Sequence, residues 1–183
     1  MAQEDVATSL LDHLRIYRKD VHDQILALVQ DLTEEQMRWQ PGDHAPSIGF
    51  HLWHLARWGD YDLQQFDGRR QIWETQNLAT AWGFPARLGE AATGTDLGDE
   101  ESANLTLPDK GFLVDYARGV FDAMDEYLEG LTPEALLRPI APREIGDRSV
   151  MNLLFTHLTH DNRHLGMIEA LRGVLGLRGT ATR

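Results

Sequence analysis

Helical periodicity is the feature that most limits how this chain can fold. Between residues 6 and 32, apolar side chains recur at three- and four-residue steps, and polar residues fill the other positions. This spacing predicts a long amphipathic helix, whose apolar stripe has to be buried against other elements. The stripe consists of Val6, Leu10, Leu14, Tyr17, Val21, Ile25, Leu28 and Leu32.

Three further segments carry a similar pattern. One begins at the N-cap Ser47 and covers residues 47–66, with so few polar sides that the helix should be largely buried. The others cover residues 110–131 and 149–173. Because no segment shows convincing strand alternation, we predict an all-α protein. Its fold is a four-helix bundle, and residues 1–183 form a single domain.

The connections between these helices differ in length. Thr33 and Gln36 form a capping-box pattern that predicts a short helical turn. Residues 139–148 contain two prolines and a glycine and are expected to be a simple connection. Residues 67–110 form a long insert between the second and third helices, broken by glycine and proline and partly acidic. We expect a short helix near residues 70–77, and tryptophans that pack the insert on the bundle as a lid.

Composition excludes several classes of function. The net charge of −12 argues against a nucleic-acid partner and against an anionic membrane surface. The chain has no cysteine, so a metal would have to be held by His, Asp, Glu or water. The N-terminus does not resemble a secretory signal, and no stretch is long and apolar enough to span a membrane. We therefore expect a cytoplasmic protein.

Histidines gather on two of the predicted core helices. In HLTHDNRH, His157, His160 and His164 lie on the core stripe, and His160 and His164 are one turn apart, about 40° around the helix. FHLWHLARW adds His51 and His54 on the buried second helix. A lone core histidine is usually only hydrogen-bonded. Several imidazoles in one core would be costly without a shared partner, and a divalent metal supplies one.

The chemistry of such a site follows from its ligands. Three neutral imidazoles with one open coordination position are typical of catalytic metal sites. Imidazole suits zinc, nickel, copper and iron, and the spacing does not choose among them. The glutamate of a metalloprotease H-E-x-x-H motif is absent, since Asp161 follows His160.

The order of these motifs resembles the DinB-like superfamily of bacterial four-helix proteins, which are regarded as metalloenzymes. The resemblance covers LTEEQMRWQPGDHAPSIGFHLWHLARW, then FLVDYARGVFDAMDEYLEGLTPEALLRP, and ends with LLFTHLTHDNRHLGMIEALRG. It extends over nearly the whole chain except the insert at 67–110. Each motif alone is unspecific, and their combination is fairly specific.

The resemblance implies a ligand set. The first ligand of the family falls on His54, before Leu55-Ala56, and the paired ligands fall on His160 and His164. His51 and His157 remain alternatives, with a pocket wall or a hydrogen bond behind a ligand as their other roles. The usual H-R-G-Q ending is altered, because Leu165 and Met167 flank Gly166. This change puts a polar role at those two positions in doubt.

Relatives of this kind include thiol-dependent transferases and isomerases. The resemblance thus implies a metal-dependent enzyme that acts on small molecules, with a small-molecule thiol as partner. We expect zinc or nickel ahead of other metals, and a homodimeric state. Metal-assisted hydrolysis fits the same histidines. The alternatives are a non-catalytic metal- or ligand-binding module of a stress response, and an interaction domain without metal.

The remaining candidates are expected to be ordinary structural residues. They are His13, His22 and His44 and the carboxylates Asp60, Asp62 and Asp161 on the surface or a helix face, and Trp53, Trp58 and Tyr61 in the core. The alternative for each carboxylate is to orient an imidazole, and the alternative for the aromatic residues is to line a ligand pocket.

Overall fold

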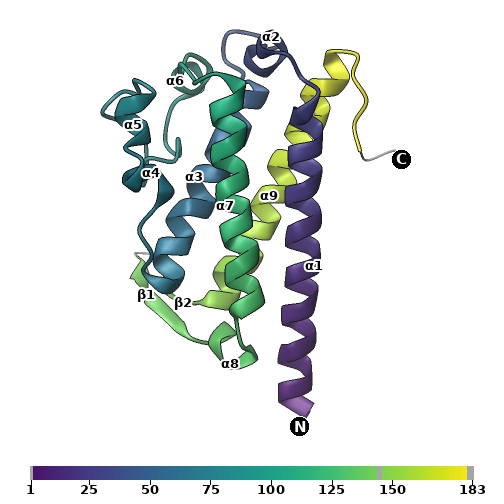
Figure 1. The fold of residues 1–183 in the computed structure, drawn as a ribbon, viewed down its shortest axis with the longest axis vertical. Helices are drawn as coiled ribbons and strands as arrows, with labels where there is room; N and C mark the ends of the chain where they lie inside the picture. Colours follow the sequence, from purple (N-terminus) through teal and green to yellow (C-terminus); the bar gives the residue numbers. More distant parts are fainter. Residues whose placement is uncertain (1, 144–145, 181–183) are drawn as a thin grey trace.

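The computed structural model of the protein describes residues 2–143 and 146–180. Within this part, four long helices form the bundle: α1 (Ala2–Gln30), α3 (Ile48–Asp67), α7 (Lys110–Gly130) and α9 (Val150–Val174). Helices α1 and α3 each pack against both α7 and α9 (Figure 1). The predicted all-α four-helix bundle is confirmed.

Local sequence signals set where these helices begin and end. The Ser47 hydroxyl accepts from the Phe50 amide at 3.2 Å, and Ser149 caps α9 in the same way. Gly68, with a φ of 78°, ends α3 in the left-handed region. The short helices α2 (Glu34–Arg38) and α8 (Pro133–Leu136) are capped by threonine hydroxyls, and α2 has the predicted capping box.

The insert carries the chain back along the bundle. Figure 1 shows that α3 and α7 run in the same direction, so the segment between them has to return over the length of a helix. It contains α4 (Ile72–Thr75), α5 (Leu78–Ala81) and α6 (Asp99–Ala103). The aromatic contacts predicted for it are present, since Trp73 and Phe84 both pack against the Trp53 ring in α3.

The connection before α9 is more ordered than we predicted. Instead of an irregular link, β1 (Pro139–Arg143) and β2 (Gly146–Ser149) pair as a two-stranded antiparallel sheet. Pairing satisfies backbone groups that a bare connection would leave to water. Two prolines concealed the strand pattern, because proline is tolerated only at sheet edges, and both strands of a two-stranded sheet are edges.

The apolar stripe of α1 is partly different from the predicted one. Val6 and Tyr17 are 59% and 55% exposed, whereas Leu11 and Arg18 are both 2% exposed. His22 was expected on a helix face and is also 2% exposed. Helix α1 therefore brings a cation and an imidazole into the bundle, among the apolar side chains that the periodicity identified.

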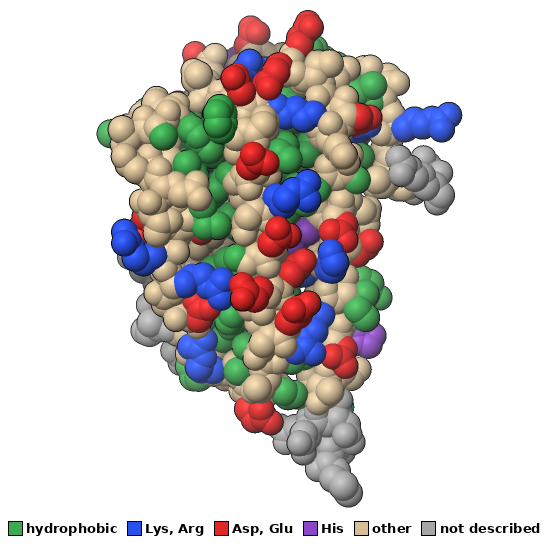
Figure 2. All heavy atoms as spheres, in the orientation of Figure 1, with side chains coloured by type: hydrophobic (Ala, Val, Ile, Leu, Met, Phe, Trp, Pro, Cys, Tyr) green, Lys and Arg blue, Asp and Glu red, His purple; other side chains and the backbone are tan. Residues whose placement is uncertain are grey.

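The face drawn in Figure 2 mixes acidic and basic side chains over α1 and α7. No broad basic surface is visible on this face. Among the residues that the structure describes, none of the helices combines the length and apolar character needed to cross a membrane.

Candidate metal centre

Three histidines from two facing helices meet inside the bundle. His54 projects from α3, and His160 and His164 project from successive turns of α9. One potential ligand atom from each lies within 4.8 Å of the other two. The Nε2 atoms of His54 and His160 are 3.1 Å apart, and the His160 and His164 ring centroids are 4.4 Å apart. The structure thus brings together the three histidines that the sequence singled out.

The other ring nitrogen of each histidine has its own neighbour. His54 Nδ1 donates to the Thr93 carbonyl at 2.7 Å, and His164 Nδ1 is 2.9 Å from His51 Nδ1. His160 Nδ1 lies 3.8 Å from Asp161 Oδ1, beyond hydrogen-bond distance. A partner on Nδ1 fixes which ring nitrogen carries the proton. In His54 the carbonyl partner places the proton on Nδ1 and leaves Nε2 free to serve as a ligand. Between His51 and His164 either Nδ1 can be the donor.

The two alternative histidines occupy different places. His51 stands behind His164 through the contact just described, which matches the expected hydrogen bond behind a ligand. His157 Nε2 lies 2.8 Å from a carboxylate oxygen of Asp62, which is fully buried in α3. His157 therefore points to a carboxylate, while its ring stays 6.0 Å from that of His160.

Burial keeps His51, His54 and His164 uncharged at neutral pH. Loss of solvation lowers the pKa of His51 and of His54 to about 4, and the pKa of His164 to about 2. For His54 and His164 the neighbouring imidazoles add to this effect. Neutral imidazole is the form that binds metal, so no proton has to leave these two rings first. The donor set of neutral nitrogens fits a borderline divalent ion such as zinc or nickel.

Apolar and aromatic side chains enclose the cluster. The Phe50 ring stacks on His54 with centroids 5.8 Å apart, and Trp58 packs against the rings of His157 and His160. Trp53 is fully buried, as expected of a core residue. His160 is the most accessible of the three, with 18% of its side chain exposed.

Asp161 belongs to a buried charged group. Arg18 Nη2 lies 3.3 Å and His22 Nε2 3.7 Å from Asp161 Oδ2, and all three residues are at most 4% exposed. Burial alone would raise the pKa of Asp161, but Arg18, with help from His160 and His22, holds it well below its usual range. His22 also stacks on Phe121, with centroids 4.1 Å apart.

The expected surface positions of three carboxylates were wrong. Asp60, Asp62 and Asp161 are 2%, 0% and 4% exposed. They are buried because each faces a positive or hydrogen-donating partner: Arg57 for Asp60, His157 for Asp62 and Arg18 for Asp161. For Asp60 and Asp62, the position on a helix with few polar sides was the available signal. No sequence signal could have identified Thr93, because its contact with His54 is made by the backbone carbonyl, which every residue has.

The fold and the cluster define a class of protein: a helical bundle in which imidazoles from facing helices converge in the interior. The family model of the DinB superfamily matches residues 19–168, and the chain belongs to this superfamily. A search of curated proteins finds no match.

Solved structures with the same fold include proteins from three bacteria. A protein from Enterococcus faecalis, described as the conserved protein of its locus, aligns with a TM-score of 0.77 at 18% identity, over 90% of this chain and 96% of the other. YfiT from Bacillus subtilis is described as a probable metal-dependent hydrolase with an unusual four-helix bundle topology. It aligns with a TM-score of 0.63 at 17% identity, over 91% of this chain and 88% of the other. A DinB-like protein from Bacillus cereus aligns with a TM-score of 0.57 at 15% identity, over 89% of this chain and 91% of the other. At these identities the similarity establishes the fold alone.

Proposed function

We propose that the protein is a metal-dependent enzyme acting on small molecules, with His54, His160 and His164 as ligands of a divalent transition metal, zinc or nickel. The observation that carries the proposal is the convergence of three ligand atoms within 4.8 Å from α3 and α9. Burial supports it, because imidazoles packed together away from water gain more from a shared cation than from one another.

The surrounding residues suit a reactive site more than a closed structural one. Among the residues that the structure describes, three protein ligands converge, whereas structural zinc sites use four. A divalent ion held by three neutral imidazoles supplies a Lewis acid that lowers the pKa of a water or thiol in the open position. Phe50 and Trp58 limit water around the cluster, and the partial exposure of His160 leaves a side for a ligand to approach.

Two reactions fit this arrangement. Attack by a small-molecule thiol in a transferase or isomerase reaction follows from the family resemblance. Hydrolysis is favoured by the His157–Asp62 pair, which places an imidazole oriented by a carboxylate beside the His160 ring. YfiT, which has the same fold, is described as a probable metal-dependent hydrolase. Fold likeness is weak support for a particular reaction.

Cobalt spectroscopy separates these readings. Co²⁺ added to protein purified without an affinity tag should give a visible spectrum of a low-coordinate nitrogen site. If the reaction uses a thiol, a low-molecular-weight thiol should shift that spectrum and add a sulfur-to-cobalt band; a hydrolase should instead show spectral titration of bound water. A spectrum that no thiol, small anion or pH change alters would support a non-catalytic module.

The control variants come from the chain itself. Replacement of His160 or His164 by alanine should abolish the cobalt spectrum, whereas replacement of the exposed His13 should leave it unchanged. An unchanged spectrum after both cluster substitutions would refute the ligand assignment. Size-exclusion chromatography of the same samples tests the homodimer that we include in the proposal.

A further inference from the structure

The insert between α3 and α7 contacts the histidine cluster through one short loop. In residues 88–95, the Glu90 amide donates to the Thr95 carbonyl and the Gly94 amide donates to the Leu88 carbonyl. These bonds close the loop on itself. Thr93, at its centre, is fully buried, and its carbonyl accepts the hydrogen bond from His54 Nδ1. The insert thus supplies the hydrogen-bond partner of a candidate ligand.

Three residues on one face of α3 hold this loop. His54, Arg57 and Trp58 follow one another at helical spacing, so their side chains leave α3 on the same side. Arg57 donates to the carbonyls of Ala92 and Ala91 at 2.9 and 3.1 Å, and Trp58 Nε1 donates to the Thr95 hydroxyl at 3.1 Å. Together they bind four of the five consecutive residues from 91 to 95.

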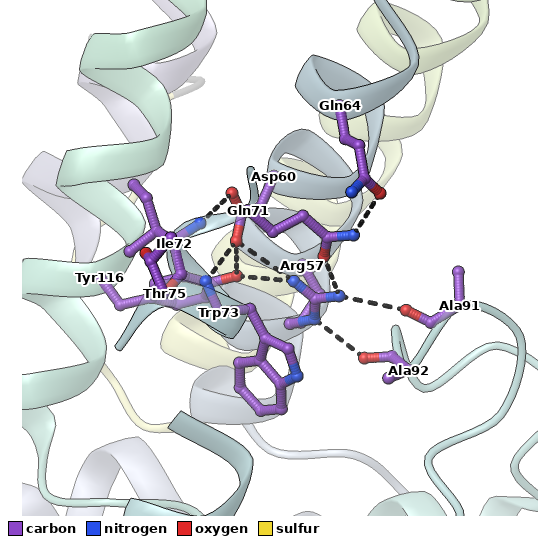
Figure 3. A network of polar contacts seen from close by, with 10 residues as sticks. All are labelled: Arg57, Asp60, Gln64, Gln71, Ile72, Trp73, Thr75, Ala91, Ala92 and Tyr116. Carbon is purple, nitrogen blue, oxygen red and sulfur yellow. Dashed lines mark hydrogen bonds and ion pairs between the residues drawn. The ribbon is translucent and has the colours of Figure 1, made fainter. Parts of the chain in front are cut away.

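Side chains outside the loop also hold the Arg57 guanidinium in place (Figure 3). It is 1% exposed and donates to the Tyr116 hydroxyl at 3.0 Å and to Gln71 Oε1 at 2.8 Å. Asp60 lies 3.3 Å from Nη1, and the Trp73 ring lies 4.6 Å from the guanidinium carbon. With these groups in place, Nε and part of Nη2 are directed at the loop carbonyls.

The loop backbone needs such a hold. Ala91 and Ala92 have φ values of 49° and 54°, a left-handed conformation that alanine adopts only under constraint. Gly94 follows with a φ of 90°, and a Cβ there would meet the Trp53 ring at 2.7 Å. The carbonyls that Arg57 binds belong to the two strained alanines directly before Thr93. Released from Arg57, the loop would relax, and the Thr93 carbonyl would move away from His54.

We infer that Arg57 is a positioning residue of the histidine cluster, which acts through the Ala91–Ala92 carbonyls to hold the Thr93 carbonyl against His54. The consequence is that His54 keeps its proton on Nδ1 and presents Nε2 to His160 and His164. The insert is then a fixed wall of the site instead of a mobile lid. The inference rests on the proposed function where it concerns metal affinity, and on geometry alone where it concerns the His54 tautomer.

Arg172 provides a matched control for a purely structural role. It is a buried arginine, 4% exposed, that donates to the carbonyls of Leu28 and Arg178 and pairs with Asp31. It lies two helical turns beyond His164, about 12 Å along α9. Arg57→Gln and Arg172→Gln therefore remove the same group and similar bonds, but only the first disturbs the 91–95 loop.

The first measurement is the ring ¹⁵N spectrum of His54 in metal-free protein at neutral pH. The unaltered protein and Arg172→Gln should show one tautomer, protonated at Nδ1, and Arg57→Gln should show a mixture. The second is the dissociation constant for Zn²⁺, which should rise by about tenfold or more in Arg57→Gln and stay within about twofold in Arg172→Gln.

A single Nδ1–H tautomer together with unchanged zinc affinity in Arg57→Gln would overturn the inference. If Arg57→Gln does not fold, Arg57→Lys serves instead. The lysine ammonium keeps the charge beside Asp60 but cannot donate to both loop carbonyls as the planar guanidinium does. The same tautomer mixture is expected there, and its absence contradicts the inference. Failure of the unaltered protein to bind Zn²⁺ would refute the proposed function, while the tautomer measurement still decides the role of Arg57.

Discussion

His54 Nε2 and His160 Nε2 lie 3.1 Å apart although 106 positions separate the two residues in the chain. The contact exists because α3 and α9 pack side by side, and each turns its histidine-bearing face inward. Without a cation, such a contact is a hydrogen bond in which one Nε2 donates and the other accepts. Under the proposed function, both Nε2 atoms would instead be ligands of the cation.

Acidification should destabilise the metal-free protein. The pKa values of His51 and His54 in the folded protein are about 4, below the ordinary value of 6.5. Between these pH values the unfolded chain therefore binds more protons than the folded chain. Stability should therefore fall as pH drops from about 6.5 towards 4, by up to about 1.4 kcal/mol per pH unit for each histidine. Asp161 does not contribute in this window, because its pKa is lowered from 3.8. Urea unfolding between pH 7 and 4.5 checks this, and a flat profile would contradict it.

His157 should be dispensable for metal binding. We expect His157→Gln to change zinc affinity by less than about threefold, because His157 faces Asp62, whereas His160→Ala should weaken affinity by at least about a hundredfold. The His157 variant should still lose stability, since Asp62 is fully buried and loses its imidazole partner. Isothermal titration with Zn²⁺ compares the two variants. Equal losses of affinity would show that the ligand set includes His157.

The Arg18–Asp161 pair should be strongly coupled. Replacement of either partner leaves a charge in the bundle core, so Asp161→Asn should cost about 3–5 kcal/mol of unfolding free energy. The double variant Arg18→Met with Asp161→Asn should cost much less than the sum of the single changes. The exposed pair Lys19–Asp23 is the comparison, for which loss of Lys19 should cost less than about 1 kcal/mol. Additive losses at Arg18 and Asp161 in urea unfolding would rule out the coupling.

Relief of loop strain should stabilise the protein. Ala92 has a φ of 54°, so glycine should fit that position better, and Ala92→Gly should raise stability by about 0.5–1 kcal/mol. The control is Ala123→Gly in the middle of α7, which should lower stability by about 1 kcal/mol because the backbone there is helical. Thermal unfolding measures both variants. A similar loss in the two would mean that the Ala92 backbone is not strained.

Much of the fold could be predicted from the sequence because its signals are local. Capping hydroxyls at Ser47 and Ser149 and three- or four-residue apolar spacing define the helices without reference to the rest of the chain. The spacing of His160 and His164 likewise predicts a shared face. The prediction failed where long-range partners decide the outcome. Arg18 and His22 are buried because Asp161 lies opposite them, and a contact between such distant parts of the chain leaves no local sequence pattern.

The same limit applies to the candidate site. His54 could be chosen over His51 only by resemblance, since both lie on the buried helix; what separates them in the structure is that His54 Nε2 faces His160, while His51 contacts His164 Nδ1. The role of the 91–95 loop could not be predicted at all. Its carbonyls are sequence-independent groups, and their position depends on Arg57, which lies more than thirty residues earlier in the chain.

The most direct test of the account is the metal content of protein purified without an affinity tag, compared with a variant in which His54, His160 and His164 are all replaced by alanine. Elemental analysis should find about one zinc or nickel ion per chain in the unaltered protein after dialysis, and none in the triple variant. An unaltered protein that carries no metal, and binds none when Zn²⁺ or Ni²⁺ is added, would contradict the central claim.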